Sequence, residues 1–75
     1  MPITPFLRNE AFDPDLIDTM SAALTQACTT LGLVDRADPI TEVVAHHIIK
    51  LAQRGIRTQT ALYLATIEEF KANAQ

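Results

Sequence analysis

The sequence predicts an all-α fold, a three-helix bundle-like domain preceded by an extended N-terminal arm. Two observations carry this prediction. Apolar residues recur at the three- and four-residue spacing of amphipathic helices in three successive segments. Aspartate followed by proline opens the first two segments, and glycine closes both of them. We expect helices over residues 14–31, 39–54 and 59–72, within a single domain of residues 13–75.

The N-terminal arm comprises residues 1–12. Its two prolines prevent a continuous α-helix, yet it contains the apolar residues Ile3, Phe6 and Leu7. One interpretation is a leader whose apolar side chains cover part of the core. The other is a strap on which these three residues dock to a partner protein.

The first helix has the clearest amphipathic pattern in the chain. Asp13 is its expected N-cap, and Gly32 followed by Leu33 is a typical helix stop. The stripe predicted to face the core comprises Leu16, Met20, Ala23, Leu24, Ala27, Cys28 and Leu31.

The second helix is the densest apolar block, with Asp38 as N-cap and Gly55 followed by Ile56 at its end. We expect it to be central to the core. Its predicted buried face is Ile40, Val43, Val44, His47, Ile48 and Leu51, extended at the side by Ala45, Ile49 and Ala52. Its predicted fully exposed residues are His46, Lys50, Gln53 and Arg54.

The third helix has a less regular pattern after its expected cap at Thr58. Its predicted apolar face is Tyr63, Leu64, Ile67 and Phe70, whereas Leu62 is expected alone on the far side. A secondary apolar spot of this kind suits contact with a second subunit.

Composition and charge favour a small cytoplasmic protein. The 75 residues have a formal net charge of −3, one cysteine and no tryptophan. The acidic balance disfavours general attraction to nucleic acid or to an anionic membrane, and no apolar run approaches the length of a membrane span. The N-terminus does not have the basic and apolar regions of a secretory signal. So small a core favours self-association, and we expect a homodimer.

Candidate catalytic and metal-binding residues are few. Cys28 lies on the apolar stripe, where a free cysteine behaves as a small hydrophobic residue. Glu42 and His46 are four residues apart and could share one face, but two ligands do not complete a metal site. The sequence therefore predicts neither an enzyme nor a cofactor.

His47 is a candidate pH-sensitive core position, because it falls within the apolar face of the second helix. A core histidine bonded to a backbone carbonyl is the simplest interpretation. If His47 is buried, the charged imidazolium is disfavoured in the folded state, and we expect stability to be lost as the pH falls.

A cluster of Lys50, Arg54, Arg57 and Gln59 surrounds the glycine turn between the second and third helices. Two helices joined by a short turn are loosely like a DNA-reading helix-turn-helix. Basic residues at a helix C-terminus are also expected from the helix dipole alone. Nucleic-acid binding is therefore the alternative function.

The segments AFDPDLIDTM and EVVAHHIIKLAQRG, followed by a helix that contains Ala61 and Leu62, resemble short helical proteins of rhizobia and related alphaproteobacteria. The resemblance covers residues 11–70. It implies a small cytoplasmic bacterial domain without an assigned activity, and it transfers no functional residue. The leading prediction is a non-catalytic protein-interaction or regulatory module that binds another protein or a second copy of itself.

Overall fold

The three predicted helices are all present in the computed structural model, which describes residues 3–7, 12–33 and 38–72. Helix α1 spans Pro14–Leu31, α2 spans Pro39–Gln53 and α3 spans Gln59–Ala72. A short 3-10 helix, η1, spans Thr4–Phe6. The described residues contain no strand, so the all-α three-helix fold is confirmed. Helix α2 ends one residue before the predicted boundary, within the usual spread at helix ends.

Each helix begins at the predicted cap. The carboxylate of Asp13 accepts a hydrogen bond from the backbone N–H of Asp15 at 3.1 Å, and that of Asp38 accepts from Ile40 at 2.9 Å. The Thr58 hydroxyl accepts from the N–H of Ala61 at 3.3 Å. These bonds satisfy donors that the first turn of a helix leaves unpaired.

The ends of α1 and α2 have the same geometry. Gly32 and Gly55 have φ values of 75° and 101°, in the region that favours glycine. After them, Leu33 donates to the carbonyl of Cys28 at 2.8 Å, and Ile56 donates to that of Leu51 at 3.1 Å. Both ends are Schellman motifs, as the sequence predicts.

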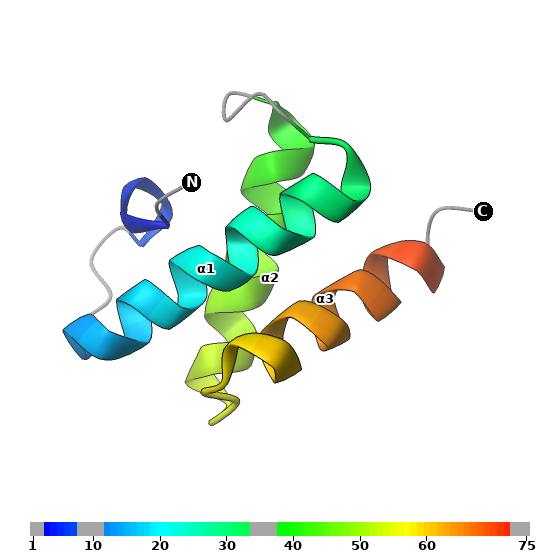
Figure 1. Cartoon of the computed structure of the whole chain (residues 1–75). Coiled ribbons are helices and arrows are strands. Elements are labelled where there is room, and N and C mark those ends of the chain that lie inside the picture. The colour runs from blue at the N-terminus through cyan, green and yellow to red at the C-terminus, as the bar shows by residue number, and fades with distance from the viewer. Residues whose placement is uncertain (1–2, 8–11, 34–37, 73–75) are drawn as a thin grey trace.

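Helices α1 and α3 lie side by side and run in the same direction, with α2 crossing behind α1 in this view (Figure 1). Two hydrogen bonds join α1 to α3: Gln59 Nε2 donates to Gln26 Oε1 at 3.2 Å, and the hydroxyls of Thr30 and Tyr63 are 2.8 Å apart. From the first bond to the second, the bonded residue moves four positions toward the C-terminus on both helices. The two helices are therefore parallel.

The core lies where the three helices meet. Six of the seven residues predicted for α1 are buried, and Leu31 is half-buried. The buried face of α2 is rotated from the predicted one, because Ile40 and Val43 are exposed. It comprises Thr41, Val44, Ala45, Ile48, Ile49, Leu51 and Ala52.

The predicted face of α3 is wrong at two leucines. Leu62 is fully buried, whereas Leu64 is 55% exposed. Thr66, one turn after Leu62, is also fully buried, and Ile67 is buried beside it. The buried face of α3 therefore includes Leu62 and Thr66, which are four residues apart. A pattern based on apolar side chains does not reveal this face, because Thr66 is polar.

In the N-terminal arm, residues 3–7 are not extended: Thr4–Phe6 form η1, and Ile3 and Leu7 flank it with helical backbone angles. Ile3 and Leu7 are buried in the core, and Phe6 packs against it. The N–H of Ile3 donates to Ser21 Oγ on α1 at 3.0 Å. The predicted docking arm of Ile3, Phe6 and Leu7 is corrected accordingly: Ile3 and Leu7 have no surface left for a partner, because they cover this chain's own core.

Candidate functional site

The most distinctive surface of the molecule is a stripe along α2, which we name the outer face of α2: Ile40, Val43, His47, Lys50 and Arg54. Ile40 is 51% exposed and Val43 is 55% exposed, and Lys50 and Arg54 are also exposed. The five residues alternate in steps of three and four, the spacing that keeps side chains facing a neighbouring helix. The stripe is therefore shaped to pack against another helix, with apolar residues at its start and cations at its end.

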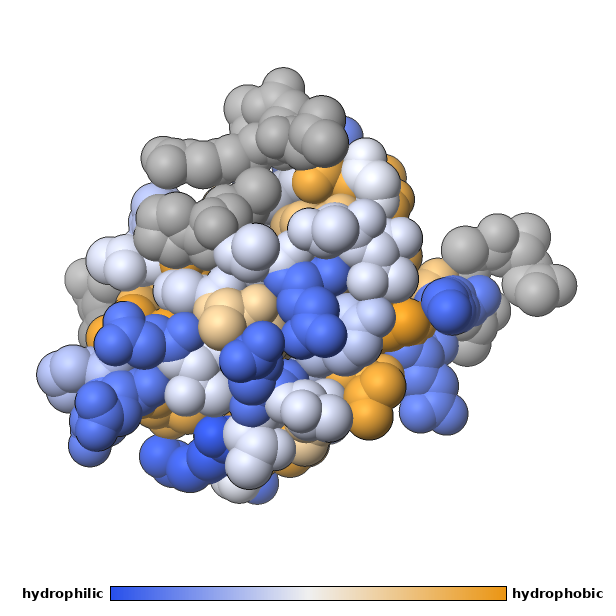
Figure 2. Space-filling view, in the orientation of Figure 1, coloured by the Kyte–Doolittle hydropathy of each residue, from blue (hydrophilic) through white to orange (hydrophobic). Residues whose placement is uncertain are grey.

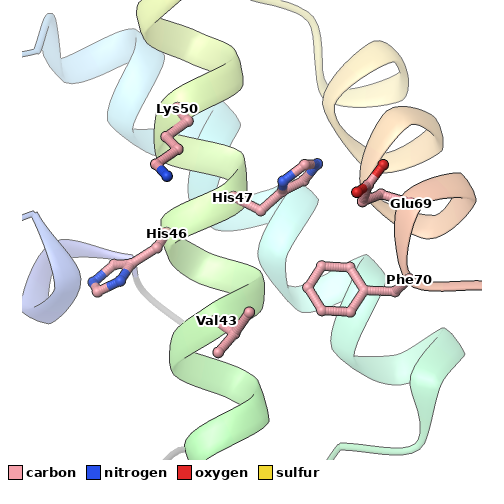
Figure 3. Close-up of a pocket in the computed structure, with 6 residues that line it drawn as sticks. All are labelled: Val43, His46, His47, Lys50, Glu69 and Phe70. Atoms are coloured by element: carbon pink, nitrogen blue, oxygen red, sulfur yellow. The ribbon is translucent and has the colours of Figure 1, made fainter. Parts of the chain in front are cut away.

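The outer face continues into an open pocket of about 400 Å³ between α2 and α3. Its lining residues are Val43, His46, His47, Lys50, Glu69 and Phe70 (Figure 3). Val43 and Phe70 supply an apolar patch from two helices, and His47 and Glu69 project toward each other in the space between the helices.

His47 lies at the edge of the core and not within it. It is half-buried, and its ring meets that of Phe70 edge to face, with centroids 5.8 Å apart and planes at 89°. An edge-to-face aromatic contact holds the imidazole in place without enclosing it. The prediction of a buried core histidine is therefore corrected, because the His47 side chain stays partly exposed beside Phe70 of α3.

The two adjacent histidines do not converge. Figure 3 shows His47 projecting toward α3 and His46 projecting to the opposite side of α2. In the part of the chain that the structure describes, no three histidine, cysteine, aspartate or glutamate side chains are grouped to hold a metal ion. The pair Glu42 and His46 accordingly gains no third ligand among these residues.

Cys28 is buried in α1, as predicted, with 2% of its surface exposed. Burial raises the pKa of the Cys28 thiol. A nucleophilic cysteine requires an exposed thiolate, and this environment favours the protonated thiol instead.

The predicted nucleic-acid patch is only partly assembled. Lys50, Arg54 and Arg57 are exposed at the end of α2 and in the turn that follows. Gln59 is exposed as well, but its side-chain amide donates to Gln26 of α1. The structure thus leaves the three cations exposed and directs Gln59 toward α1.

Figure 2 shows the face on which α1 and α3 lie in front, and it is largely hydrophilic with separate apolar spots. Leu64 of α3 is the one large apolar side chain outside α2 that is more than half exposed among the described residues. None of the helices in the described ranges is long and apolar enough to cross a membrane.

Sequence reasoning missed the outer face of α2, because it assigned Ile40 and Val43 to the core. The signal was available: the same three-and-four spacing runs on through Lys50 and Arg54, which a buried face would exclude. Comparison of the chain with protein-family models, curated proteins and solved structures finds no match.

Proposed function

We propose that this chain is a small, non-catalytic protein-interaction module that binds a helix of its partner along the outer face of α2. One observation carries the proposal: Ile40 and Val43, two large apolar side chains, are half exposed on the same face of one helix. Exposed apolar side chains that lie together mark interaction sites more often than isolated ones do.

The neighbouring residues support a protein ligand over a small molecule. His46 and His47 diverge around α2, and of the polar side chains that line the pocket only His47 and Glu69 project toward each other. A small-molecule site needs converging polar groups in a deep cavity, whereas a helix can lie along a shallow stripe. The burial of Cys28 likewise supports a role without covalent catalysis.

A capture experiment with two matched variants tests the proposal. The tagged chain is incubated with nuclease-treated lysate of its source organism, and the bound proteins are quantified by mass spectrometry. Val43→Lys should lose the bound protein. Leu64→Lys should retain it, because Leu64 is equally exposed but lies on α3. Equal capture by both variants would refute the outer face of α2 as the binding surface.

Helix-turn-helix DNA binding is the second candidate, favoured by the exposure of Lys50, Arg54 and Arg57 around the α2–α3 turn. Phosphate contacts by these cations would make duplex binding fall steeply with salt. Replacing both Arg54 and Arg57 by alanine should then abolish binding and flatten the salt dependence. Absence of duplex binding at low salt would remove this candidate.

A cytoplasmic, bacterial setting completes the proposal. It is supported by the single cysteine, which cannot form an internal disulfide, and by the resemblance to rhizobial helical proteins. Fractionation of native cells with an antibody to the chain tests the compartment: the chain should appear with cytosolic markers.

A further inference from the structure

The outer face of α2 changes in character along its length. Ile40 and Val43, near the start of the helix, are apolar and more than half exposed. Lys50 lies in the last turn and Arg54 follows as the C-cap, and both side chains are exposed. A helix that covers the whole face must therefore be apolar at one end and complementary to two cations at the other.

The two cations are available to a partner. Neither Lys50 nor Arg54 has an ion-pair partner within the ranges that the structure describes. Glu69 lines the neighbouring pocket, but Figure 3 shows Lys50 on the side of α2 away from it. Because Lys50 and Arg54 are four residues apart on one helix, their charges add on the same side of α2. This end of the face therefore attracts carboxylates.

The apolar end of the face has room for an anchoring side chain. Val43 of α2 and Phe70 of α3 line the open pocket of about 400 Å³ from two helices (Figure 3). A large apolar side chain of a partner helix, placed over Val43, would enter this space and leave the water. Apolar anchors of this kind hold an amphipathic helix in a groove.

The dipole of the partner helix determines its direction. Acidic side chains stabilise a helix when they lie in its first turn, at the positive end of its dipole. A partner that runs antiparallel to α2 places its first turn over Lys50 and Arg54, at the C-terminal end of α2. The two helix dipoles are then also opposed. A parallel partner would carry its acids near its own C-terminus, where the dipole disfavours them.

We infer that the outer face of α2 binds an acidic amphipathic helix, packed antiparallel to α2. Its acidic residues lie near its N-terminus and meet Arg54 and Lys50, and its later apolar residues cover Val43 and Ile40. This inference rests on the proposed function and names the chemistry of the partner. Ile40 and Arg54 are 14 positions apart, which is about 21 Å along a helix, so the partner helix needs about four turns.

Synthetic peptides test the inference, with the full chain as receptor. Each peptide is an alanine-rich helix of about 20 residues, because shorter helices are marginal in water. The acidic probe has two glutamates four residues apart near its N-terminus, and leucines seven and ten residues after the second glutamate. This spacing matches Arg54, Lys50, Val43 and Ile40 in an antiparallel pair. The lysine probe replaces both glutamates by lysine, and the reversed probe has the acidic sequence in the opposite order.

Fluorescence anisotropy measures the affinity of each labelled probe. The wild type should bind the acidic probe, and added salt should weaken binding because it screens exposed charges. The lysine probe and the reversed probe should bind about tenfold more weakly or less. Val43→Lys should lose the acidic probe, whereas Leu64→Lys should retain it, because Leu64 lies on α3.

A charge exchange tests the contact at the basic end. Lys50→Glu combined with Arg54→Glu should weaken binding of the acidic probe by about tenfold or more and should bind the lysine probe instead. Arg57→Glu combined with Lys71→Glu is the matched control, since it changes the net charge equally at two exposed residues outside the outer face. This control should still bind the acidic probe. Far-UV circular dichroism confirms that each variant is folded.

Several results would overturn the inference. One is a wild type that does not bind the acidic probe at millimolar concentration, and another is equal binding of the acidic and lysine probes. Binding of a DNA duplex without binding of the acidic probe would assign the cations to the nucleic-acid candidate. Self-association that Val43→Lys abolishes, again without binding of the acidic probe, would assign this face to a second copy of the chain.

The failure of the inference and that of the proposed function are distinguishable. A protein captured from lysate that is lost with Val43→Lys but retained with Lys50→Glu and Arg54→Glu supports the interaction module and overturns its acidic partner. Equal capture by Val43→Lys and Leu64→Lys refutes the binding surface itself.

Discussion

At the residue scale, Thr66 is the one buried side chain in the described part of the chain whose polar atom has no hydrogen-bond partner. It is fully buried in α3, at the centre of the helix face that packs on the core. An unpaired buried hydroxyl costs free energy that an apolar group of the same shape would not. This residue is therefore a weak point in the core.

Thr66→Val should raise the free energy of unfolding by about 1 kcal/mol, because it removes the unpaired hydroxyl and keeps the shape. Chemical denaturation with urea measures the change. Thr41→Val is the matched control, since Thr41 is equally buried but is not without a partner. It should lower stability, and an equal loss in both variants would show that the Thr66 hydroxyl is bonded.

Cys28 predicts the behaviour of the protein in alkali. Its pKa is raised by burial, so the folded chain holds the thiol proton to higher pH than the unfolded chain does. The contribution of the Cys28 thiol to the free energy of unfolding is fully present below the pKa of the thiol in the unfolded chain. It is lost as the pH rises through the pKa of the thiol in the folded chain. The free energy of unfolding, measured at increasing alkaline pH, should therefore fall more steeply for the wild type than for Cys28→Ala. Parallel curves would contradict this prediction.

At the scale of the helices, the ends of α1 and α2 depend on glycine. Gly55→Ala should cost about 1–2 kcal/mol, because its φ of 101° is unfavourable for any residue with a Cβ atom. Apart from its two neighbours in the chain, no residue lies within 4 Å of the added carbon, so the cost is one of backbone conformation. Gly32→Ala, at a φ of 75°, should cost less. Thermal unfolding ranks the two, and the reverse order would contradict this reading of the turns.

The helices also show what the sequence could and could not predict. Caps and stops are local, so Asp13, Asp38 and Gly55 sufficed to place the helix boundaries. Which face of each helix is buried depends on neighbouring residues that are distant in sequence. Ile40 and Leu64 were assigned to the core because they are apolar, but more than half of each side chain is exposed. Thr66 was overlooked because it is polar.

At the scale of the whole molecule, the N-terminal segment completes the core. Ile3 is fully buried and is tied to α1 through Ser21, so it belongs to the same packing unit as the helices. The radius of gyration of the chain is 11.2 Å, close to the value of about 11 Å expected for a well-packed protein of this length.

Ile3→Ala should therefore destabilise the protein by about 2–4 kcal/mol, the usual cost of removing a large side chain from a core. Leu64→Ala, at an exposed position, should change stability by less than about 0.5 kcal/mol. Urea denaturation of both variants makes the comparison. Similar small effects would mean that the segment is not part of the folded unit in solution.

The apolar surface that this packing leaves exposed is the start of the outer face of α2, and the central proposal is that a helix of a partner protein binds along this face. Amide chemical shifts in ¹H–¹⁵N spectra, recorded as the partner protein from the capture experiment is added, test this most directly. The account predicts progressive changes at Ile40, Val43, His47 and Lys50, with Leu64 and Gln26 unchanged. Spectra that do not change as the partner is added, or changes centred on Leu64, would contradict it.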